Sequence, residues 1–244
     1  MKITILGYWG GYPSAGGATA GYLISTDEGN ILLDCGSGVV SRLYFYANVE
    51  HISGVVLSHL HYDHIADIGI LQYAAVGALR NGRMKEKLSI YAPAEPAEQF
   101  QKLHGSHSDV SVIDPQQSIA IAGADIRFLP VKHTIPCYAV KIQYRNKTLV
   151  YSADTSYTDA LAHFAENADI LLCEATICQG SKHTTGEGHM DAAQAGMIAK
   201  KANVGKLVLT HLPHDGNFEL MKDAAIKEFN KEVYVPPLHD TFLL

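Results

Sequence analysis

The chain has 244 residues, of which 47% are hydrophobic and 18% are charged, and its formal net charge at pH 7 is -6. This balance is typical of a globular protein with a sizeable core, and we expect a single domain over residues 1–244. The acidic balance, with no block of Lys or Arg, argues against tight binding to long nucleic acid, which requires a basic stripe.

Membrane and export signals are weak. No apolar run approaches the ~20 residues that span a bilayer, and the apolar core at the N-terminus is too short for a signal peptide. The four cysteines form no C-x-x-C pair and lie mostly in apolar, strand-like contexts: Cys35, Cys137, Cys173 and Cys178. We therefore expect reduced thiols and a cytoplasmic protein.

Hydrophobic periodicity predicts strands and helices in chain order. The predicted strands are Lys2–Leu6, Tyr22–Thr26, Asn30–Asp34, Gly54–Leu57, Leu88–Tyr91, Ser118–Ala122, Ile126–Val131, Tyr138–Tyr144, Thr148–Ser152, Ile170–Cys173, Leu207–Leu209 and Val233–Val235. The predicted helices are Gly36–Asn48, Ile65–Leu79, Pro96–His104, Thr158–Asn167, Met190–Ala202 and Phe218–Phe229. Strands precede helices in two successive halves, which favours two sheets packed face to face with helices outside.

The most informative motif follows the apolar run Val55-Val56-Leu57 and reads H-x-H-x-D-H: His59, His61, Asp63 and His64. On extended backbone, residues two apart point the same way, so His59 and His61 can bind one ion together. Asp63 and His64 follow where a helix should begin, and can face a second ion. Since the chain has 13 His, a histidine-rich surface loop is the alternative, but the order of residues favours two metal ions.

Three further candidate ligands each follow a predicted apolar strand: His133, Asp154 and His211. Each residue on its own would be read as a cap or turn residue. After H-x-H-x-D-H they complete a set large enough for two ions. Imidazole and carboxylate ligands suit zinc first, and manganese or iron can also be bound.

With these residues the chain resembles the metallo-β-lactamase superfamily along essentially its whole length. Asp34, in Leu32-Leu33-Asp34-Cys35-Gly36, is similar to the first motif, a buttressing aspartate. The resemblance implies an αββα sandwich of two mixed sheets with a dinuclear site at one edge. It also implies that one ion is held by His59, His61 and His133 and the other by Asp63, His64 and His211, with Asp154 bridging the two.

Within this superfamily the chain is most similar to the ribonuclease Z group and its phosphodiesterase relatives. The similar segments are Leu6–Pro13, His133–Ala139, Cys173–Thr176 and Gly188–Asp191. The resemblance implies that His189, oriented by Glu174, protonates the leaving oxygen, whereas without it both residues read as ordinary polar positions at element ends. It also implies that Asp63 binds metal and orients the nucleophile, and that Asp34, with Asp67 as a second candidate, orients ligand imidazoles.

The chain departs from the tRNA-processing members of that group. Only 20 residues separate His133 from Asp154, which leaves no room for a tRNA-gripping arm, and His189-Met190-Asp191 replaces a His-Ser-Thr motif. We therefore expect hydrolysis of a small phosphodiester, such as a cyclic nucleotide or short oligonucleotide. The alternatives are a thioester, lactone or β-lactam hydrolase, a tRNA 3′-processing endonuclease, a redox di-iron protein, and a non-catalytic scaffold.

Other residues have less certain roles. Tyr8, Trp9 and Tyr12 lie in the Gly-rich opening loop and either stack on a nucleobase or cover an edge of the core. His104 and His107 are expected in a polar loop, outside the ligand set, while His183 and His214 remain open. Two apolar helices could pair subunits as a homodimer. No membrane partner is expected.

Overall fold

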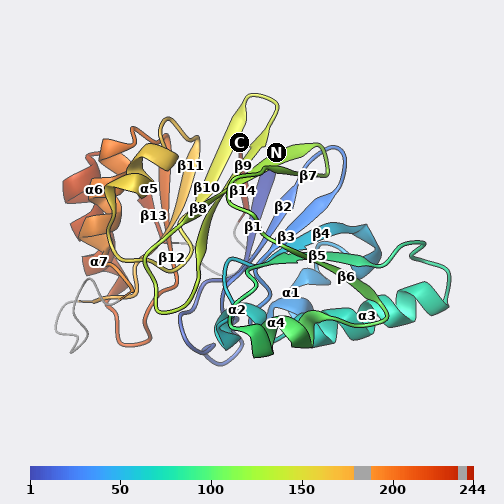
Figure 1. Ribbon diagram of the computed structural model, residues 1–244. Coiled ribbons are helices and arrows are strands. Elements are labelled where there is room, and N and C mark those ends of the chain that lie inside the picture. Colours follow the sequence, from blue (N-terminus) through green and yellow to red (C-terminus); the bar gives the residue numbers. More distant parts are fainter. Residues whose placement is uncertain (179–187, 236–240) are drawn as a thin grey trace.

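The computed structural model describes residues 1–178, 188–235 and 241–244. In this part of the chain two seven-stranded sheets pack face to face, with helices on their outer sides (Figure 1). The predicted αββα sandwich of two mixed sheets is confirmed. No helix among the described residues is long and apolar enough to cross a membrane.

The first sheet has the order β14-β1-β2-β3-β4-β5-β6. It comprises β14 (Thr241–Leu243), β1 (Lys2–Gly7), β2 (Gly21–Ser25), β3 (Asn30–Leu33), β4 (Ile52–Val56), β5 (Leu88–Ala92) and β6 (Ser108–Val112). Strands β14 to β3 pair antiparallel, and β3 to β6 pair parallel.

The second sheet has the order β13-β12-β11-β10-β9-β8-β7. It comprises β13 (Val233–Tyr234), β12 (Lys206–Thr210), β11 (Ile170–Glu174), β10 (Lys147–Tyr151), β9 (Tyr138–Tyr144), β8 (Ala124–Pro130) and β7 (Ile119–Ile121). Pairing is antiparallel from β7 to β10 and parallel from β10 to β13.

Alternation along the strands divides the core into two clusters, because successive side chains of a strand point to opposite faces. In β3, Ile31 and Leu33 belong to the large cluster that also contains Ile142 and Leu149 of the second sheet. Leu32, between them, belongs to a separate cluster under the helices of the first sheet. The inter-sheet core therefore holds the two halves of the molecule together.

Helices cover both outer faces, as Figure 1 shows. The first sheet carries α1 (Val39–Leu43), the 3-10 turn Val49–His51, α2 (Tyr62–Ile65), α3 (Ile68–Arg80) and α4 (Ala97–Leu103). The second sheet carries α5 (Asp159–Phe164), α6 (Ala192–Lys201) and α7 (Phe218–Phe229). Helix α6 begins with a capping box, in which Asp191 and Gln194 satisfy each other's backbone amides.

Two helix predictions were wrong in extent. The helix predicted over Gly36–Asn48 is only α1, Val39–Leu43. Its start is delayed because Gly36 packs against the Asp63 carbonyl, where a Cβ would overlap, and Gly38 has a φ of 83°. The helix predicted over Ile65–Leu79 is divided into α2 and α3.

Strands β6 and β14 were not predicted. Both lie at an edge of the first sheet, and they expose many of their side chains: Asp109, Ser111 and Val112 in β6, and Thr241 and Leu243 in β14. An edge strand needs little hydrophobic alternation, so periodicity gives no strong signal for it. The His104–His107 segment leads into β6, and neither histidine belongs to a ligand cluster.

Candidate metal centre

The candidate ligands converge because strands that run in one direction end at one edge. Strands β10, β11 and β12 are parallel, and β8 runs the same way as β10 because both are antiparallel to β9. His133, Asp154 and His211 follow the ends of β8, β10 and β12, and the H-x-H-x-D-H segment follows β4. Connections that leave strand ends on both sheets thus meet at one site.

Two of these connections hold the backbone in the left-handed region that L residues seldom adopt. His211 itself has a φ of 50°, and Ala153, directly before Asp154, has a φ of 52°. Each residue is fully or almost fully buried. Strain of this kind persists where the surroundings over-determine the backbone, and it is common at functional sites.

Three imidazoles form the first ligand group: His59, His61 and His133. His61 Nδ1 lies 3.1 Å from His59 Nε2 and 3.0 Å from His133 Nε2. Burial lowers the pKa of all three imidazoles, most strongly that of the fully buried His59, and the neighbouring His64 lowers the pKa of His59 further. Neutral rings that direct nitrogens at one point are suited to bind a divalent cation.

The second group comprises Asp63, His64, Asp154 and His211. His211 Nε2 lies 3.1 Å from Asp63 Oδ2 and 3.2 Å from Asp154 Oδ2. His64 Nε2 lies 3.4 Å from the same Asp154 oxygen. Burial by itself would raise the pKa of both carboxyl groups, but the neighbouring histidines lower it, so both are carboxylates.

Asp154 faces both groups. Its Oδ2 also lies 3.7 Å from His59 Nε2 and 3.9 Å from His133 Nε2. Among the candidate ligands, two buried polar atoms have no hydrogen-bond partner in the described part of the chain, namely Asp154 Oδ1 and His64 Nε2. An orphaned buried acceptor is rare unless water or an ion completes it. The donor set and these orphaned atoms fit divalent metal ions.

The other nitrogen of most candidate ligand rings is already held. His64 Nδ1 donates to Asp34 Oδ2 at 2.8 Å, and His133 Nδ1 donates to the Gly188 carbonyl at 2.9 Å. His59 Nδ1 lies 3.1 Å from Ser58 Oγ, and His211 Nδ1 lies 2.7 Å from Thr176 Oγ1. Such partners fix the ring orientation and leave the opposite nitrogen free for a metal.

Asp34 is the centre of a buried network. It is fully buried, and it accepts hydrogen bonds from the Ser58 amide at 2.7 Å, Ser58 Oγ at 2.8 Å and Tyr151 OH at 3.0 Å, besides His64. Asp67 differs from the prediction, because its Oδ2 accepts from the Val40 amide at 3.0 Å and so supports α1.

The glycines of the opening loop allow it to approach the ligands. The Gly11 amide donates to Asp63 Oδ2 at 2.8 Å, and Gly11 has a φ of 72°. A Cβ on Gly10 would lie 2.8 Å from His211 Nδ1. A side chain at Gly10 would displace the His211 ring, whereas Gly11 is required because its backbone lies in the left-handed region that L residues rarely adopt.

His189 and Glu174 form the predicted pair. His189 Nδ1 donates to Glu174 Oε1 at 2.9 Å, and the fully buried Glu174 also accepts from the amides of Thr155 and Thr176. Burial would lower the pKa of His189, but the hydrogen bond and charge of Glu174 raise it to about 9. His189 can therefore carry a proton at neutral pH.

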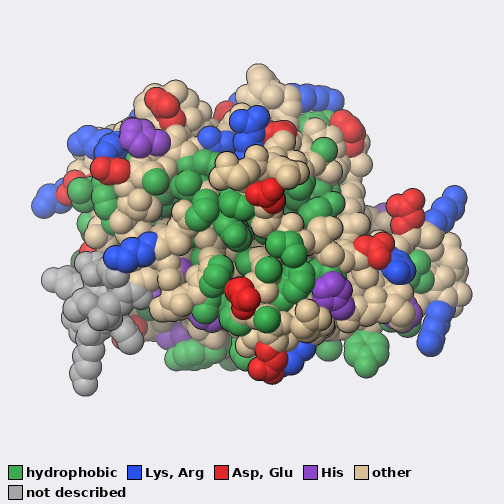
Figure 2. All heavy atoms as spheres, in the orientation of Figure 1, with side chains coloured by type: hydrophobic (Ala, Val, Ile, Leu, Met, Phe, Trp, Pro, Cys, Tyr) green, Lys and Arg blue, Asp and Glu red, His purple; other side chains and the backbone are tan. Residues whose placement is uncertain are grey.

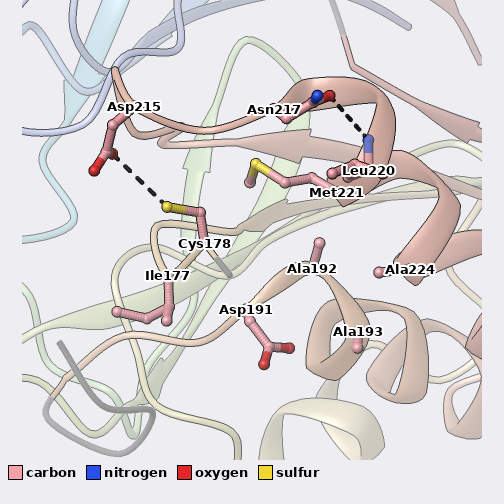
Figure 3. Close-up of a pocket in the computed structure, with 10 residues that line it drawn as sticks. All are labelled: Ile177, Cys178, Asp191, Ala192, Ala193, Asp215, Asn217, Leu220, Met221 and Ala224. Atoms are coloured by element: carbon pink, nitrogen blue, oxygen red, sulfur yellow. Dashed lines mark hydrogen bonds between the residues drawn. The ribbon is translucent and has the colours of Figure 1, made fainter. Parts of the chain in front are cut away.

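The ligand groups open into a cavity of about 750 Å³. His189, Thr134, Tyr12, Tyr62 and His214 are among its lining residues. A second pocket of about 500 Å³ adjoins it and shares Cys178 and Asp215 with it. Figure 3 shows this pocket between α6 and α7, with the Cys178 thiol pointing to Asp215.

Comparison with known proteins agrees with this geometry. Residues 29–212 match the family model described as a beta-lactamase superfamily domain. The chain belongs to the beta-lactamase superfamily. It is 41% identical over 236 residues to the probable metallo-hydrolase YhfI of Bacillus subtilis, covering 96% of both chains. The crystal structure of that protein has a TM-score of 0.94 to this chain at 40% identity, over 99% of this chain and 98% of the other.

More distant relatives support the predicted subgroup. The chain is 25% identical to a ribonuclease Z of Thermobifida fusca, over 86% of this chain and 83% of the other. The Zn²⁺-bound PqqB of Methylobacterium extorquens shares the fold, with a TM-score of 0.77 at 16% identity over the whole of both chains. The relatives and the ligand cluster make this chain an enzyme, a metal-dependent hydrolase.

The sequence analysis missed several residues that support the candidate ligands. Thr176, Gly11 and Tyr151 carry no ligand-type signal of their own, and their role depends on contacts between distant segments. Cys178 is half-buried and lines both pockets, whereas Cys35, Cys137 and Cys173 are buried. His183 lies outside the described residues.

Proposed function

We propose that this enzyme hydrolyses small phosphodiesters with two divalent metal ions, zinc first and manganese as the alternative. His59, His61 and His133 would hold one ion, Asp63, His64 and His211 the other, and Asp154 both. When bound, the two ions lower the pKa of water and neutralise charge on the phosphoryl oxygens. The single observation that carries the proposal is the Asp154 carboxylate, which faces both ligand groups while one of its buried oxygens has no partner among the described residues.

The chain's own residues supply the proton transfer. His189 lies beside both groups, with ring centroids 5.0 Å from His133 and 5.5 Å from His211. The hydrogen bond and charge of Glu174 raise its pKa, to about 9 in the metal-free chain, so it can hold a proton and donate it to a leaving oxygen. Glu174 fixes the ring through Nδ1, so Nε2 is the atom left to give the proton.

Asp63 and the opening loop orient the site. The Gly11 amide holds Asp63 Oδ2, which fixes the carboxylate beside His211 Nε2. In this position Asp63 can bind metal and accept a hydrogen bond from the attacking water. The loop also closes one wall of the cavity, because Gly10 and Gly11 line it.

A small substrate is favoured over a precursor tRNA. The segment between His133 and Asp154 is occupied by the β9–β10 hairpin, whose turn is Arg145-Asn146. On the face in Figure 2, Lys and Arg side chains lie apart and alternate with Asp and Glu. The likeness to ribonuclease Z supports a phosphodiester bond as the target. Because the described segment between His133 and Asp154 holds this hairpin and no arm, a substrate shorter than a tRNA is favoured.

The test is metal content followed by a substrate panel. Protein loaded with zinc or manganese should contain two ions per chain and cleave bis(p-nitrophenyl) phosphate or a cyclic nucleotide faster than a thioester, a β-lactam or a precursor tRNA. The Asp154→Ala variant is the inactive control. Faster turnover of the thioester or β-lactam would replace this proposal by acyl hydrolysis, and stoichiometric iron with a visible spectrum would indicate redox chemistry.

A further inference from the structure

The three aromatic residues of the opening loop have different surroundings. Tyr8 is 8% exposed and belongs to the inter-sheet core. Trp9 packs against that core and is half-buried. Tyr12, by contrast, leaves 63% of its surface exposed. Covering an edge of the core therefore explains Tyr8 and Trp9, but it does not explain Tyr12.

Tyr12 is the outermost ring of a stacked column. His214 lies between two aromatic rings, at a centroid distance of 4.4 Å and an interplanar angle of 7° from Trp9, and at 3.9 Å and 9° from Tyr12. Trp9 is supported in turn by Tyr8 and Phe218, at 5.2 and 5.6 Å. The column thus runs from the core to Tyr12 at the surface.

Hydrogen bonds fix this column to the metal centre. His214 Nε2 donates to the Tyr12 carbonyl at 2.7 Å. Two further hydrogen bonds attach the opening loop to segments that carry candidate ligands. The Gly10 amide donates to the Leu212 carbonyl at 3.1 Å, and the Gly11 amide donates to Asp63. Leu212 directly follows the ligand His211 in the chain. The position of Tyr12 relative to the candidate metal ligands is therefore set by the fold.

Tyr12 and His214 both line the cavity of the metal centre. One face of the Tyr12 ring is covered by His214 and most of the remaining surface is exposed. A ring that is already ordered loses little entropy when a ligand stacks on it. Ordered aromatic faces beside a phosphate site are how proteins hold bases without reading their sequence.

We propose that the outer face of Tyr12 is the platform on which the base of a nucleoside phosphodiester stacks while its phosphate lies at the metal centre. This inference rests on the proposed function and narrows the substrate to diesters that carry a planar base on at least one arm. The Trp9–His214 pair acts as a positioning support for Tyr12. Because every base has a π-face, the platform should bind diesters that carry any base more tightly than diesters whose arms are simple alkyl groups.

The first test compares two substrates with the same leaving group. Thymidine 5′-(p-nitrophenyl phosphate) carries a base, and methyl p-nitrophenyl phosphate does not. In the metal-loaded full chain, Tyr12→Ala should lower kcat/KM for the thymidine ester between about 5-fold and about 150-fold, the range expected for one base–aromatic stack. The loss should lie mainly in KM, the methyl ester should be unaffected, and Tyr12→Phe should behave like the wild type.

The matched control is Tyr73→Ala, which removes a tyrosine that is 78% exposed on α3 and does not line the cavity. This variant should have the wild-type kcat/KM for both substrates. An equal loss of activity toward both esters in Tyr12→Ala would overturn the platform, because the ring would then act on the part that the substrates share. Unchanged kinetics for the thymidine ester would overturn it as well.

The second test does not require turnover. Trp9 is the only tryptophan of the chain and is part of the column, so its emission reports on stacking at Tyr12. Thymidine 5′-monophosphate should change this emission saturably in the wild type and in Tyr73→Ala, but not in Tyr12→Ala, and ribose 5-phosphate should have no effect. An identical response in Tyr12→Ala would refute the platform.

Failure of the two proposals can be told apart. If the wild type cleaves neither ester but cleaves a thioester or β-lactam, the proposed phosphodiesterase function is wrong, and the fluorescence titration still decides whether Tyr12 stacks a base. If the wild type cleaves both esters and Tyr12→Ala does so equally well, the function stands and only the platform is wrong.

Discussion

Replacing Asp34 by Asn tests whether the buried network controls the second metal site. Asp34 has a φ of 56°, a left-handed conformation that Asn tolerates better than most residues, so the backbone should be kept. Asp34 Oδ2 accepts from three donors, Ser58 Oγ, His64 Nδ1 and Tyr151 OH, and Oδ1 accepts from the Ser58 amide.

An asparagine cannot satisfy these donors in either orientation of its amide. If the NH₂ group replaces Oδ2, the two hydroxyls can rotate to accept, but His64 Nδ1–H faces a donor. If the amide is flipped, the buried Ser58 amide is the donor left without an acceptor. A buried unsatisfied donor costs about 1–3 kcal/mol, and the remaining bonds lose charge assistance. We expect the free energy of unfolding of the metal-free protein to fall by about 2–4 kcal/mol.

The Asp34→Asn substitution should weaken metal binding by changing which nitrogen of His64 carries the proton. The ring can relieve the conflict by moving its proton to Nε2, which then cannot bind metal. Loss of such a supporting partner typically lowers metal affinity about 10–100-fold. Titration calorimetry with zinc should therefore show one tight site, from His59, His61 and His133, and one weakened site.

The matched control is Asp67→Asn, which removes a carboxylate from the same region that contacts the Val40 amide and no ligand ring among its described contacts. It should bind two ions as the wild type does. Two wild-type affinities in Asp34→Asn would refute the reasoning, because His64 would then not depend on Asp34 for its orientation.

Three further predictions concern individual residues of the site. Asp154→Ala removes the carboxylate that faces both ligand groups, so atomic absorption should find fewer than two ions per chain and turnover should vanish; full turnover would exclude a bridging role. Gly10→Ala places a Cβ 2.8 Å from His211 Nδ1, so metal content and kcat should fall while the melting temperature of the metal-free protein stays near that of the wild type. His189→Gln should lower kcat with metal content unchanged, and normal rates would make His189 a structural residue. The folded pKa of His189 is raised to about 9 from 6.5, so its protonation stabilises the metal-free protein by at most about 3 kcal/mol. This contribution is complete below pH ~6.5 and is lost as the pH rises toward ~9. Urea titrations should show this fall in stability in the wild type and a smaller fall in His189→Gln.

The fold could be predicted largely from local pattern, and so could the residues that gather in the candidate ligand groups. Alternation in segments such as Tyr138–Tyr144 and Thr148–Ser152 marks strands because one or both faces are buried. H-x-H-x-D-H is informative because two residues on an extended strand share a direction, whatever the rest of the chain does. The remaining ligand-type residues stand out because each follows an apolar strand, and strand ends meet at sheet edges.

Other features were decided only by tertiary contacts. The outlying strand Thr241–Leu243 pairs with β1 from the other end of the chain, and the extent of α1 depends on the approach of Gly36 to Asp63. No spacing reveals such contacts, because they join segments that are far apart in sequence and depend on how the layers pack.

The same holds for the chemistry of the site. Sequence alone determined which residue types can bind metal and at which strand ends they lie. Only the packed structure decided which ring nitrogen of each histidine faces the candidate metal site. Gly188 and Thr176 hold the opposite nitrogens of His133 and His211. The packed structure also decided that Tyr8 is buried and Tyr12 is exposed, although both are aromatic residues of one loop. Burial depends on which other parts of the molecule pack against each ring.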